Sequence, residues 1–238
     1  MKISDNRSND KSESPLTFRI GKFLAHAGVC TRRGAAEFLA TNEIWFNNLK
    51  ISDLNLKIPA EATLIINGRT VSLASTEIVL LNKPAGFVCT HKEQKNQKSI
   101  FRLLPESMKH YFFAGRLDEE SRGLMVLSNN GSFIYNLSHP SMEVQKIYEV
   151  SISRPLSPQE IEKIKRGIWS KGEKLRVDNI VELANKTTYE LTLHEGKNRE
   201  IRRIFESLGI QVHDLYRIRL GDYWIDSINE GSYVCLSA

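Results

Sequence analysis

The chain has 238 residues, of which 41% are hydrophobic and 26% charged, so it is long enough for one large domain or two smaller ones with ordinary cores. Its formal charge of +5 permits a polyanionic partner without requiring one. No apolar run approaches the roughly 20 residues of a membrane span, and residues 1–15 lack the apolar core of a secretory signal, so we expect a cytoplasmic protein with no membrane partner.

The N-terminal part of the sequence predicts a tail and a small domain. Residues 1–15 are rich in Ser, Asn, Asp and Lys and almost free of apolar side chains, which predicts a disordered tail. From Phe18 the apolar residues recur with a helical period that Gly28 ends, and Thr31 is a suitable N-cap for a second helix. Strands at 44–46 and 63–66 follow.

These elements define an α+β domain at 16–68, and the polar residues 69–76 are expected to form a linker. A second domain, 77–238, begins with a strand at 78–81, whose continuous apolar run is typical of a strand buried on both faces. The charged segment 91–98 holds no aliphatic residue and is expected to be a loop.

The stretch Gly115-Arg116-Leu117-Asp118 precedes the apolar run 124–127, which ends in Ser128-Asn129-Asn130-Gly131. A strand that begins behind an Arg/Asp pair and ends in a turn places a carboxylate and a guanidinium where a rigid sheet meets solvent. Arg116 and Asp118 are two residues apart, so we expect them to share one face of the strand. Judged by its residue type alone, Asp118 would more commonly be a turn or capping carboxylate.

The rest of the second domain alternates between strands and helices without a βαβ repeat, which favours an α+β fold with a mixed, mainly antiparallel sheet. Ser157 and Glu160 form a capping-box pattern with Pro158 at the first helical position, and Gly167 ends that helix. The other expected elements are a helix at 132–138, strands at 146–152, 177–183, 188–193, 215–220 and 233–236, and a helix whose buried face is Ile201, Ile204, Phe205 and Leu208.

The cysteines and glycines give no sign of a cofactor. Cys30, Cys89 and Cys235 are far apart and lack the paired spacing of a zinc site or a disulfide framework, so reduced thiols are expected. The chain contains no phosphate-binding glycine loop, His/Cys ligand cluster or dinucleotide fingerprint. We therefore expect no metal and no cofactor.

Four ordered segments resemble the motifs of the pseudouridine synthases, in particular the RsuA/RluB branch. They are Leu81–Gly86, Gly115–Gly131, Lys146–Val150 and Glu195–Arg203. With the N-terminal domain, the resemblance covers about residues 16–223. It implies an isomerase that detaches uracil from ribose, turns it and reattaches it through a ring carbon, without a metal or nucleotide cofactor.

The resemblance also implies roles for particular residues. Asp118 would be the catalytic carboxylate, acting as nucleophile or as base at the sugar; Arg202 would pair with it and Tyr148 would stack on the extruded uracil. The expected substrate-binding residues also include Arg116, which would hold or replace the flipped nucleotide, and Ile201, which would pack near the base. Lys146 either supports the base site or is solvated, and Arg199 and Arg203 are expected to point outward from their helix and meet phosphates. Without the family, Arg202 would be interpreted as a surface arginine, Tyr148 as a core tyrosine and Arg116 as part of a surface ion pair.

The N-terminal domain looks like the S4-like RNA-binding domain, which implies that Arg19, Lys22, Arg32 and Arg33 face RNA; a solvated polar face is the alternative interpretation. The family usually has glycine-containing turns where this chain has Asn42, Asn47 and Asn48. Asn is the residue other than glycine that best tolerates left-handed backbone, so these turns are expected to persist.

The Asn-Arg-Glu-Ile-Arg-Arg form of the last motif looks more like the large-subunit branch than the small-subunit one. The expected partner is therefore ribosomal RNA, mainly 23S, or a ribosome assembly intermediate, bound by a monomeric enzyme. The alternatives are the same activity on 16S RNA and a non-catalytic RNA-binding assembly factor. An RNA methyltransferase is disfavoured because the glycine-rich cofactor loop is missing.

Overall fold

The computed structural model describes residues 17–94 and 96–237, and the chain forms two units that divide between Ala74 and Ser75. The tail expected at 1–15 lies outside the described residues. None of the helices in the described ranges is long and apolar enough to cross a membrane.

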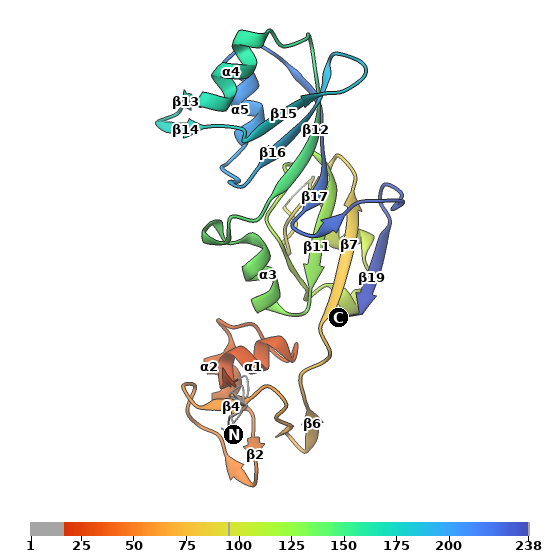
Figure 1. Cartoon of the computed structure of the whole chain (residues 1–238). Helices are drawn as coiled ribbons and strands as arrows, with labels where there is room; N and C mark the ends of the chain where they lie inside the picture. The colour runs from red at the N-terminus through yellow and green to blue at the C-terminus, as the bar shows by residue number, and fades with distance from the viewer. Residues whose placement is uncertain (1–16, 95, 238) are drawn as a thin grey trace, which may run out of the picture. The chain divides into compact units, whose positions relative to one another are not determined.

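The N-terminal unit packs two short helices with a small antiparallel sheet around one core (Figure 1). Its fully buried side chains, with no exposed surface, come from both kinds of element and include Phe23, Leu24, Ile44 and Leu64. The elements are α1 (Ile20–His26), α2 (Ala35–Thr41), a sheet in the order β3 (Leu49–Lys50), β2 (Ile44–Phe46), β5 (Leu64–Ile66) and β6 (Arg69–Val71), and the pair β1 (Thr17–Arg19) and β4 (Lys57–Pro59).

The second helix begins later than the sequence predicts. Thr31 is not its N-cap, because α2 starts at Ala35 with Gly34 as the flanking residue. Thr31 Oγ1 instead accepts a hydrogen bond of 3.0 Å from the Gly34 N–H and closes the turn that leads into the helix. A threonine can accept a hydrogen bond from the backbone N–H three residues later in a turn as well as at a helix N-cap. The sequence around Thr31 therefore does not distinguish a turn from a helix start.

Of the two asparagine turns, the one at Asn47 and Asn48 follows the prediction. Asn47 and Asn48 have φ of 48° and 63°, as a left-handed turn between β2 and β3 requires. Asn42 is extended, with φ of −125°, so the prediction was wrong there. Its side chain donates a 2.9 Å hydrogen bond to Phe38 O and thereby ends α2 through a side-chain contact rather than through left-handed backbone.

The linker expected at 69–76 begins too early. Arg69–Val71 form β6, which pairs antiparallel with β5 across a hairpin at Asn67 and Gly68. Val71 packs against the core of the N-terminal unit despite its polar neighbours. The composition of the segment suggested a linker, but register with the preceding strand places its first residues in the sheet.

The C-terminal unit is built on a mixed sheet of nine strands in the described residues (Figure 1). Most of its pairs are antiparallel, and β11 with β17 is parallel. The order is β15 (Asn179–Glu182), β16 (Thr188–Leu193), β12 (Lys146–Ile152), β17 (Val212–Leu220), β11 (Arg122–Ser128), β7 (Glu77–Lys83) and β19 (Tyr233–Ser237), with β10 (Phe112–Phe113) on β11 and β18 (Tyr223–Trp224) on β17. This is the mixed α+β sheet predicted from the sequence.

The remaining elements lie around this sheet. The helices are α3 (Gly131–Ser138), α4 (Pro158–Arg166) and α5 (Glu200–Glu206), with 3-10 turns at Ile100–Leu103, Glu106–Met108 and Pro140–Met142. Two further strand pairs are the parallel pair β8 (Phe87–Val88) and β9 (Lys98–Ser99) and the hairpin β13 (Ile168–Ser170) and β14 (Glu173–Leu175).

Strands β7 and β11 are buried on both faces, which explains their continuous apolar sequences. Leu80 and Leu124 belong to the hydrophobic cluster on one face, and Leu81 and Met125 belong to the cluster on the other. The strands therefore form a rigid centre, and the loop that leads into β11 is held at its end.

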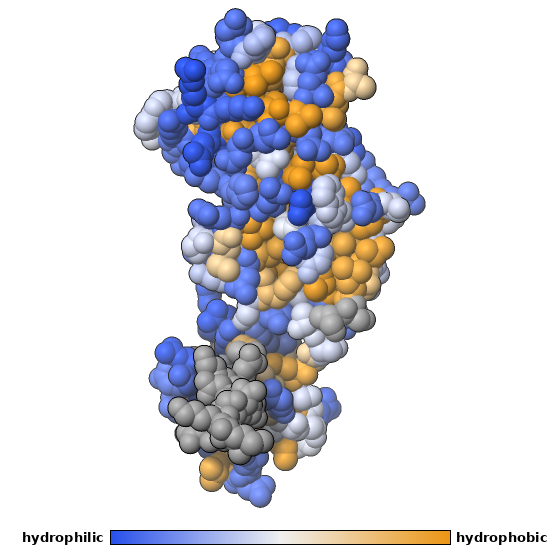
Figure 2. All heavy atoms as spheres, viewed as in Figure 1, coloured by the Kyte–Doolittle hydropathy of each residue, from blue (hydrophilic) through white to orange (hydrophobic). Residues whose placement is uncertain are grey.

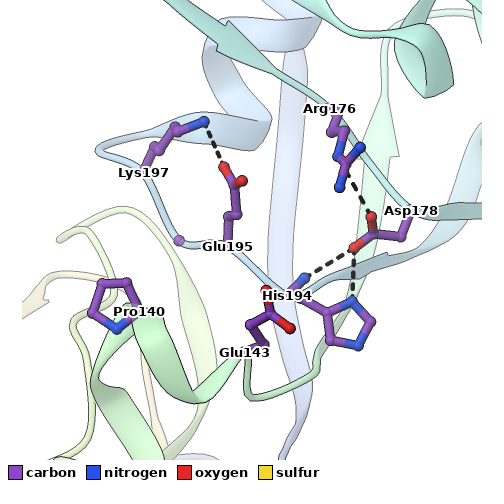
Figure 3. A pocket seen from close by; sticks show the side chains of 8 residues that line it. Pro140, Glu143, Arg176, Asp178, His194, Glu195 and Lys197 are labelled. Carbon is purple, nitrogen blue, oxygen red and sulfur yellow. Dashed lines mark hydrogen bonds and ion pairs between the residues drawn. The ribbon is translucent and has the colours of Figure 1, made fainter.

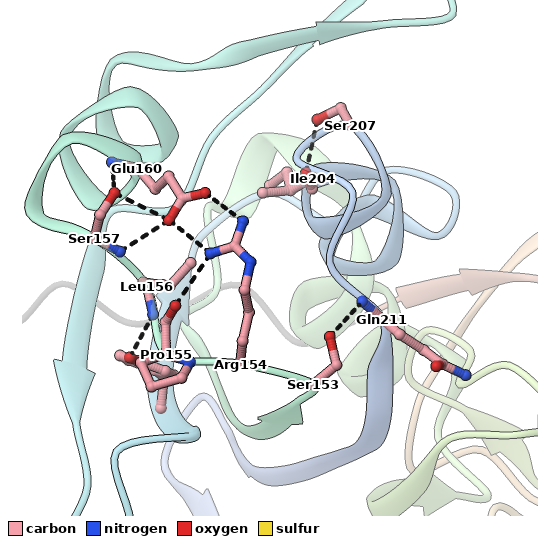
Figure 4. A network of polar contacts seen from close by, with 10 residues as sticks. Ser153, Arg154, Pro155, Leu156, Ser157, Glu160, Ile204, Ser207 and Gln211 are labelled. Atoms are coloured by element: carbon pink, nitrogen blue, oxygen red, sulfur yellow. Dashed lines mark hydrogen bonds and ion pairs between the residues drawn. The ribbon is translucent and has the colours of Figure 1, made fainter.

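Helix α4 has the capping box that the sequence predicts (Figure 4). Ser157 Oγ accepts a hydrogen bond from the Glu160 N–H, and Glu160 Oε2 accepts one of 2.8 Å from the Ser157 N–H. Arg154 donates two further hydrogen bonds to Glu160, and with the Ser157 N–H they lower the pKa of that carboxyl to about 2. These contacts, all local in the sequence, fix the start of α4.

Candidate active site

The segment 115–121, which carries Asp118, is a loop rather than part of a strand. Strand β11 begins only at Arg122, so the prediction that Arg116 and Asp118 share a strand face was wrong. Leu117 is 6% exposed and anchors the loop in the core, whereas Arg116 is exposed and the Asp118 side chain is 33% exposed. A buried leucine between two polar residues resembles strand alternation, which misled the sequence prediction.

Lys83, at the end of β7, holds this loop in place. Its ammonium group has no exposed surface and donates to the carbonyl oxygens of Pro84 (3.1 Å), Asp118 (3.1 Å), Glu119 (3.3 Å) and Ser121 (2.5 Å). Burial lowers the pKa of Lys83 to about 8. Three of the four acceptors belong to the segment that carries Asp118, so one buried cation joins a central strand to the loop.

Two arginines approach the Asp118 segment from the start of α5. Arg199 Nη1 lies 3.5 Å from Asp118 Oδ2 and 2.6 Å from Glu120 Oε1. Arg202 Nε lies 3.1 Å from the same Glu120 oxygen without hydrogen-bond geometry, and Arg202 Nη2 donates to Ser121 Oγ at 3.2 Å. The ion pair expected between Arg202 and Asp118 is therefore formed by Arg199, the arginine that was expected to meet phosphates.

Backbone geometry explains why Arg199 reaches the acid. Arg199 is the N-cap of α5 and has φ of 50°, a left-handed conformation that is uncommon for a residue with a side chain. The preceding turn is held by Glu200 Oε2, which accepts a hydrogen bond of 3.0 Å from the Lys197 N–H. Glu200 is 4% exposed, and burial raises the pKa of its carboxyl. The sequence pattern of α5 could not predict this conformation.

Arg203 does not point outward, which corrects the prediction that it meets phosphates. It is 6% exposed, and Nη1 makes a 2.8 Å ion pair with Glu173 Oε2 and a 3.2 Å hydrogen bond to Asn198 O. Its Nη2 also donates to Ser170 O. Arg203 therefore joins α5 to the β13–β14 hairpin.

Strand β12 places Tyr148 and Lys146 at the site. Tyr148 is partly buried and packs against two hydrophobic clusters, one containing Leu117 and the other containing Ile201. Lys146 Nζ donates to Val144 O at 2.8 Å and to His194 O at 3.0 Å, and burial lowers the pKa of Lys146. The lysine is thus bound to backbone and supports the loop before α5.

Arg217 on β17 is a buried residue of the site that the sequence analysis missed. It is 2% exposed, lies in register with Tyr148 on β12 and with Gly123 on β11, and donates from Nε to Leu124 O at 2.7 Å. Gly123 has φ of +110°, and a Cβ there would collide with the Arg217 backbone. The period of two from the buried Leu215 could have identified residue 217 as inward-facing.

A cavity of about 590 Å³ opens beside the loop before α5 (Figure 3). Its lining includes Asp178 and His194, whose carboxylate and imidazole lie 2.9 Å apart, together with Arg176 and Lys197. Asp118, Tyr148 and Arg202 do not line it. Within 17–94 and 96–237, no group of three His, Cys, Asp or Glu side chains is placed to hold a metal ion.

Comparison with known proteins identifies the C-terminal unit. Residues 77–207 match the family model described as RNA pseudouridylate synthase. Ribosomal small subunit pseudouridine synthase A of Vibrio cholerae is 30% identical over 90% of this chain and 94% of its own length. Ribosomal large subunit pseudouridine synthase B of Bacillus subtilis is 29% identical over 86% and 85%. A crystal structure of a pseudouridylate synthase superposes with a TM-score of 0.64 at 26% identity, covering 92% of this chain and 96% of that one.

Lys83→Met should reduce the free energy of unfolding by about 2–3 kcal/mol, because it leaves buried carbonyl groups without their donor. The measurement is denaturant unfolding, followed by circular dichroism. Lys92→Met, at an exposed lysine of the same unit, is the matched control and should change the stability by less than about 0.5 kcal/mol. If the two variants unfold at the same denaturant concentration, the Lys83 contacts do not hold the loop.

Proposed function

Because the chain belongs to the RNA pseudouridylate synthase family, we propose that it converts uridine to pseudouridine in ribosomal RNA. The observation that carries this proposal is the placement of Asp118. Its carboxylate is half-buried, stands on a loop fixed by Lys83, and has Arg199 Nη1 at 3.5 Å. The rRNA pseudouridine synthases of Vibrio cholerae and Bacillus subtilis are similar to this chain over most of its length.

The isomerisation breaks the bond from ribose C1′ to the uracil ring nitrogen and forms a bond from C1′ to a ring carbon. That ring carbon loses its proton, and the released ring nitrogen gains one, so the atoms balance. Reactants and product have the same atoms, so one group that acts at the sugar is sufficient. We assign that role to Asp118, as nucleophile at C1′ or as base on the adjacent sugar proton. Arg199 and Arg202 supply positive charge at the same segment, where they can position the carboxylate and the flanking phosphates.

The uridine must leave its base stack before Asp118 can reach the sugar. Tyr148 offers an aromatic face for the extruded base, and the buried Ile201 lies in one of the clusters against which that ring packs. Arg116 is exposed on the loop next to Asp118, where its guanidinium can hold the displaced nucleotide. Lys146 acts through the loop that it supports rather than through solvent-exposed charge.

The N-terminal unit would bind RNA through its cations. Arg19, Arg32 and Arg33 are exposed, and Lys22 lies close enough to Arg32 that burial and this repulsion lower the pKa of Lys22. Burial and the charges of Lys22 and Arg32 also lower the pKa of His26 to about 4. Convergent cations repel one another, and a phosphate backbone offsets that repulsion.

The large-subunit RNA is the proposed target. Relatives with either specificity have nearly the same identity to this chain, 30% for the small-subunit enzyme and 29% for the large-subunit one, so overall similarity does not separate them. The Asn-Arg-Glu-Ile-Arg-Arg sequence of the last motif supports the large-subunit assignment. This motif also forms the α5 contacts to the Asp118 segment.

Ribosomal RNA from a strain without the gene should lose one carbodiimide-dependent reverse-transcription stop in 23S RNA. Wild-type protein should restore the stop, and Asp118→Asn should not, because it removes the carboxylate while keeping the side-chain shape. Purified Asp118→Asn should bind the RNA with nearly unchanged affinity. A restored stop with Asp118→Asn would refute the assignment of the acid, and a loss confined to 16S RNA would refute the large-subunit target.

Replacing Lys22, Arg32 and Arg33 together by Gln should weaken RNA binding and reduce the slope of log K against log salt by about 2–3, because each phosphate contact contributes about 0.7–0.9. Filter binding between 50 and about 200 mM salt measures this slope. Arg69→Gln, at an exposed arginine of the same unit, serves as the control. A triple variant with the wild-type slope would exclude these cations from the interface.

A further inference from the structure

The β13–β14 hairpin exposes a tryptophan that its own fold does not need. Ile168 and Leu175 form the inward pair of the hairpin and are buried in the core, whereas Trp169 and Lys174 form the outward pair. Trp169 is 71% exposed, against 36% for Trp45 and 41% for Trp224. An indole left in water contributes little to folding, and on this outward face it is accessible to a partner.

The chain around this tryptophan is strongly cationic. Residues 163–176 contain six cationic side chains and one carboxylate. The carboxylate, Glu173, is already paired with Arg203 at 2.8 Å. The exposed cations are Lys163, Lys165, Arg166, Lys171, Lys174 and Arg176. Figure 2 shows hydrophilic residues along the edge of the unit where Figure 1 places the hairpin.

The hairpin is attached to the same helix that reaches Asp118. Arg203 binds Glu173 and the Ser170 carbonyl from α5, and Lys197 Nζ donates to Lys174 O at 2.8 Å from the loop before α5. Arg199, between these two anchors in the sequence, lies 3.5 Å from Asp118. The position of the hairpin is therefore coupled to the proposed catalytic loop through short, direct contacts.

We propose that the β13–β14 hairpin binds a single-stranded segment of the substrate RNA beside the target uridine. Trp169 stacks on an unpaired base, and Lys171 and Lys174 contact the phosphates on either side. An exposed aromatic ring among cations is how proteins hold unpaired nucleotides without reading their sequence. This inference rests on the proposed function, since it extends the binding site for the same RNA.

The charge pattern favours RNA over other partners. A second copy of the chain would bring six like charges against six others, which opposes self-association through this face. Double-stranded RNA has its bases paired and stacked internally, so it could use the lysines but not the indole. Loss of the indole should therefore weaken the binding of single-stranded RNA more than the binding of a duplex of similar negative charge.

The test is fluorescence anisotropy of the full chain with a labelled 20-nucleotide oligo(rA) and with a 20-base-pair RNA duplex. Oligo(rA) contains no uridine, so binding is measured without any isomerisation. Trp169→Ala should weaken oligo(rA) binding by roughly tenfold or more and change duplex binding by less than about twofold. Trp169→Phe should retain most of the affinity, because it keeps an aromatic face.

Tyr135→Ala is the matched control, since Tyr135 is 52% exposed on α3 in the same unit, and it should leave both affinities within about twofold. Lys171→Gln with Lys174→Gln should reduce the salt slope on oligo(rA) by about 1.4. Thermal melting of each variant identifies any that fail to fold. If Trp169→Ala does not fold, Trp169→Phe and the double variant Lys171→Gln with Lys174→Gln provide the test.

Equal loss of affinity for Trp169→Ala and Tyr135→Ala, or equal loss on single-stranded and duplex RNA, would overturn the proposal. Failure of this proposal can be distinguished from failure of the proposed function, because binding and isomerisation are measured separately. If the hairpin variants lose oligo(rA) affinity while the gene deletion removes no stop in ribosomal RNA, then the RNA surface stands and the proposed activity fails. If instead the gene deletion removes the stop and the hairpin variants keep their oligo(rA) affinity, the proposed activity stands and only the hairpin is excluded from the RNA-binding surface.

Discussion

The loop that carries Asp118 depends on one buried cation, the ammonium group of Lys83. It has no exposed surface, and its hydrogen bonds go to carbonyl oxygens, three of them in the loop that carries Asp118. A charge removed from water is costly unless it is fully hydrogen-bonded, so this loop and the end of β7 stabilise each other. The result is a short loop held at the end of the most deeply buried strands, with its carboxylate left accessible.

The motif at 195–203 completes the site by combining residues that anchor α5 with residues that reach the Asp118 segment. Arg203 and Glu200 are buried and fix the start of α5, while Arg199 and Arg202 extend to the Asp118 segment. Arginines that are neighbours in the sequence thus make different contacts, because successive side chains of a helix point in different directions. Arg203 also holds the β13–β14 hairpin, so α5 lies between the Asp118 segment and the surface proposed to bind the surrounding RNA.

Elements with a local sequence pattern were predicted correctly. Predictions were wrong where contacts between residues far apart in the sequence determine the conformation or burial of a residue. The boundaries of β12 and β16 were predicted correctly because alternation with burial on one face is a strong signal. Arg116 and Asp118 were wrongly placed on one strand face, because a buried leucine between two polar residues imitates the alternation of a strand. The burial of Arg203 and Arg217 was missed because charged side chains are expected at the surface, and their acceptors come from segments far away in the sequence. Motif resemblance supplied Asp118, but it could not indicate that Arg199 would lie beside it.

The central claim is that the Asp118 carboxylate acts at the ribose of a uridine extruded beside Tyr148. The most direct measurement is a crystal structure of the Asp118→Asn chain bound to a uridine-containing fragment of its ribosomal RNA target. We expect the substituted side chain at position 118 to lie within about 3.5 Å of C1′ or C2′ of one flipped uridine, the reach that a reacting pair requires. We also expect that base to lie against the ring of Tyr148. A uridine that remains stacked in the RNA, or that binds with its sugar beyond reach of residue 118, would contradict the account.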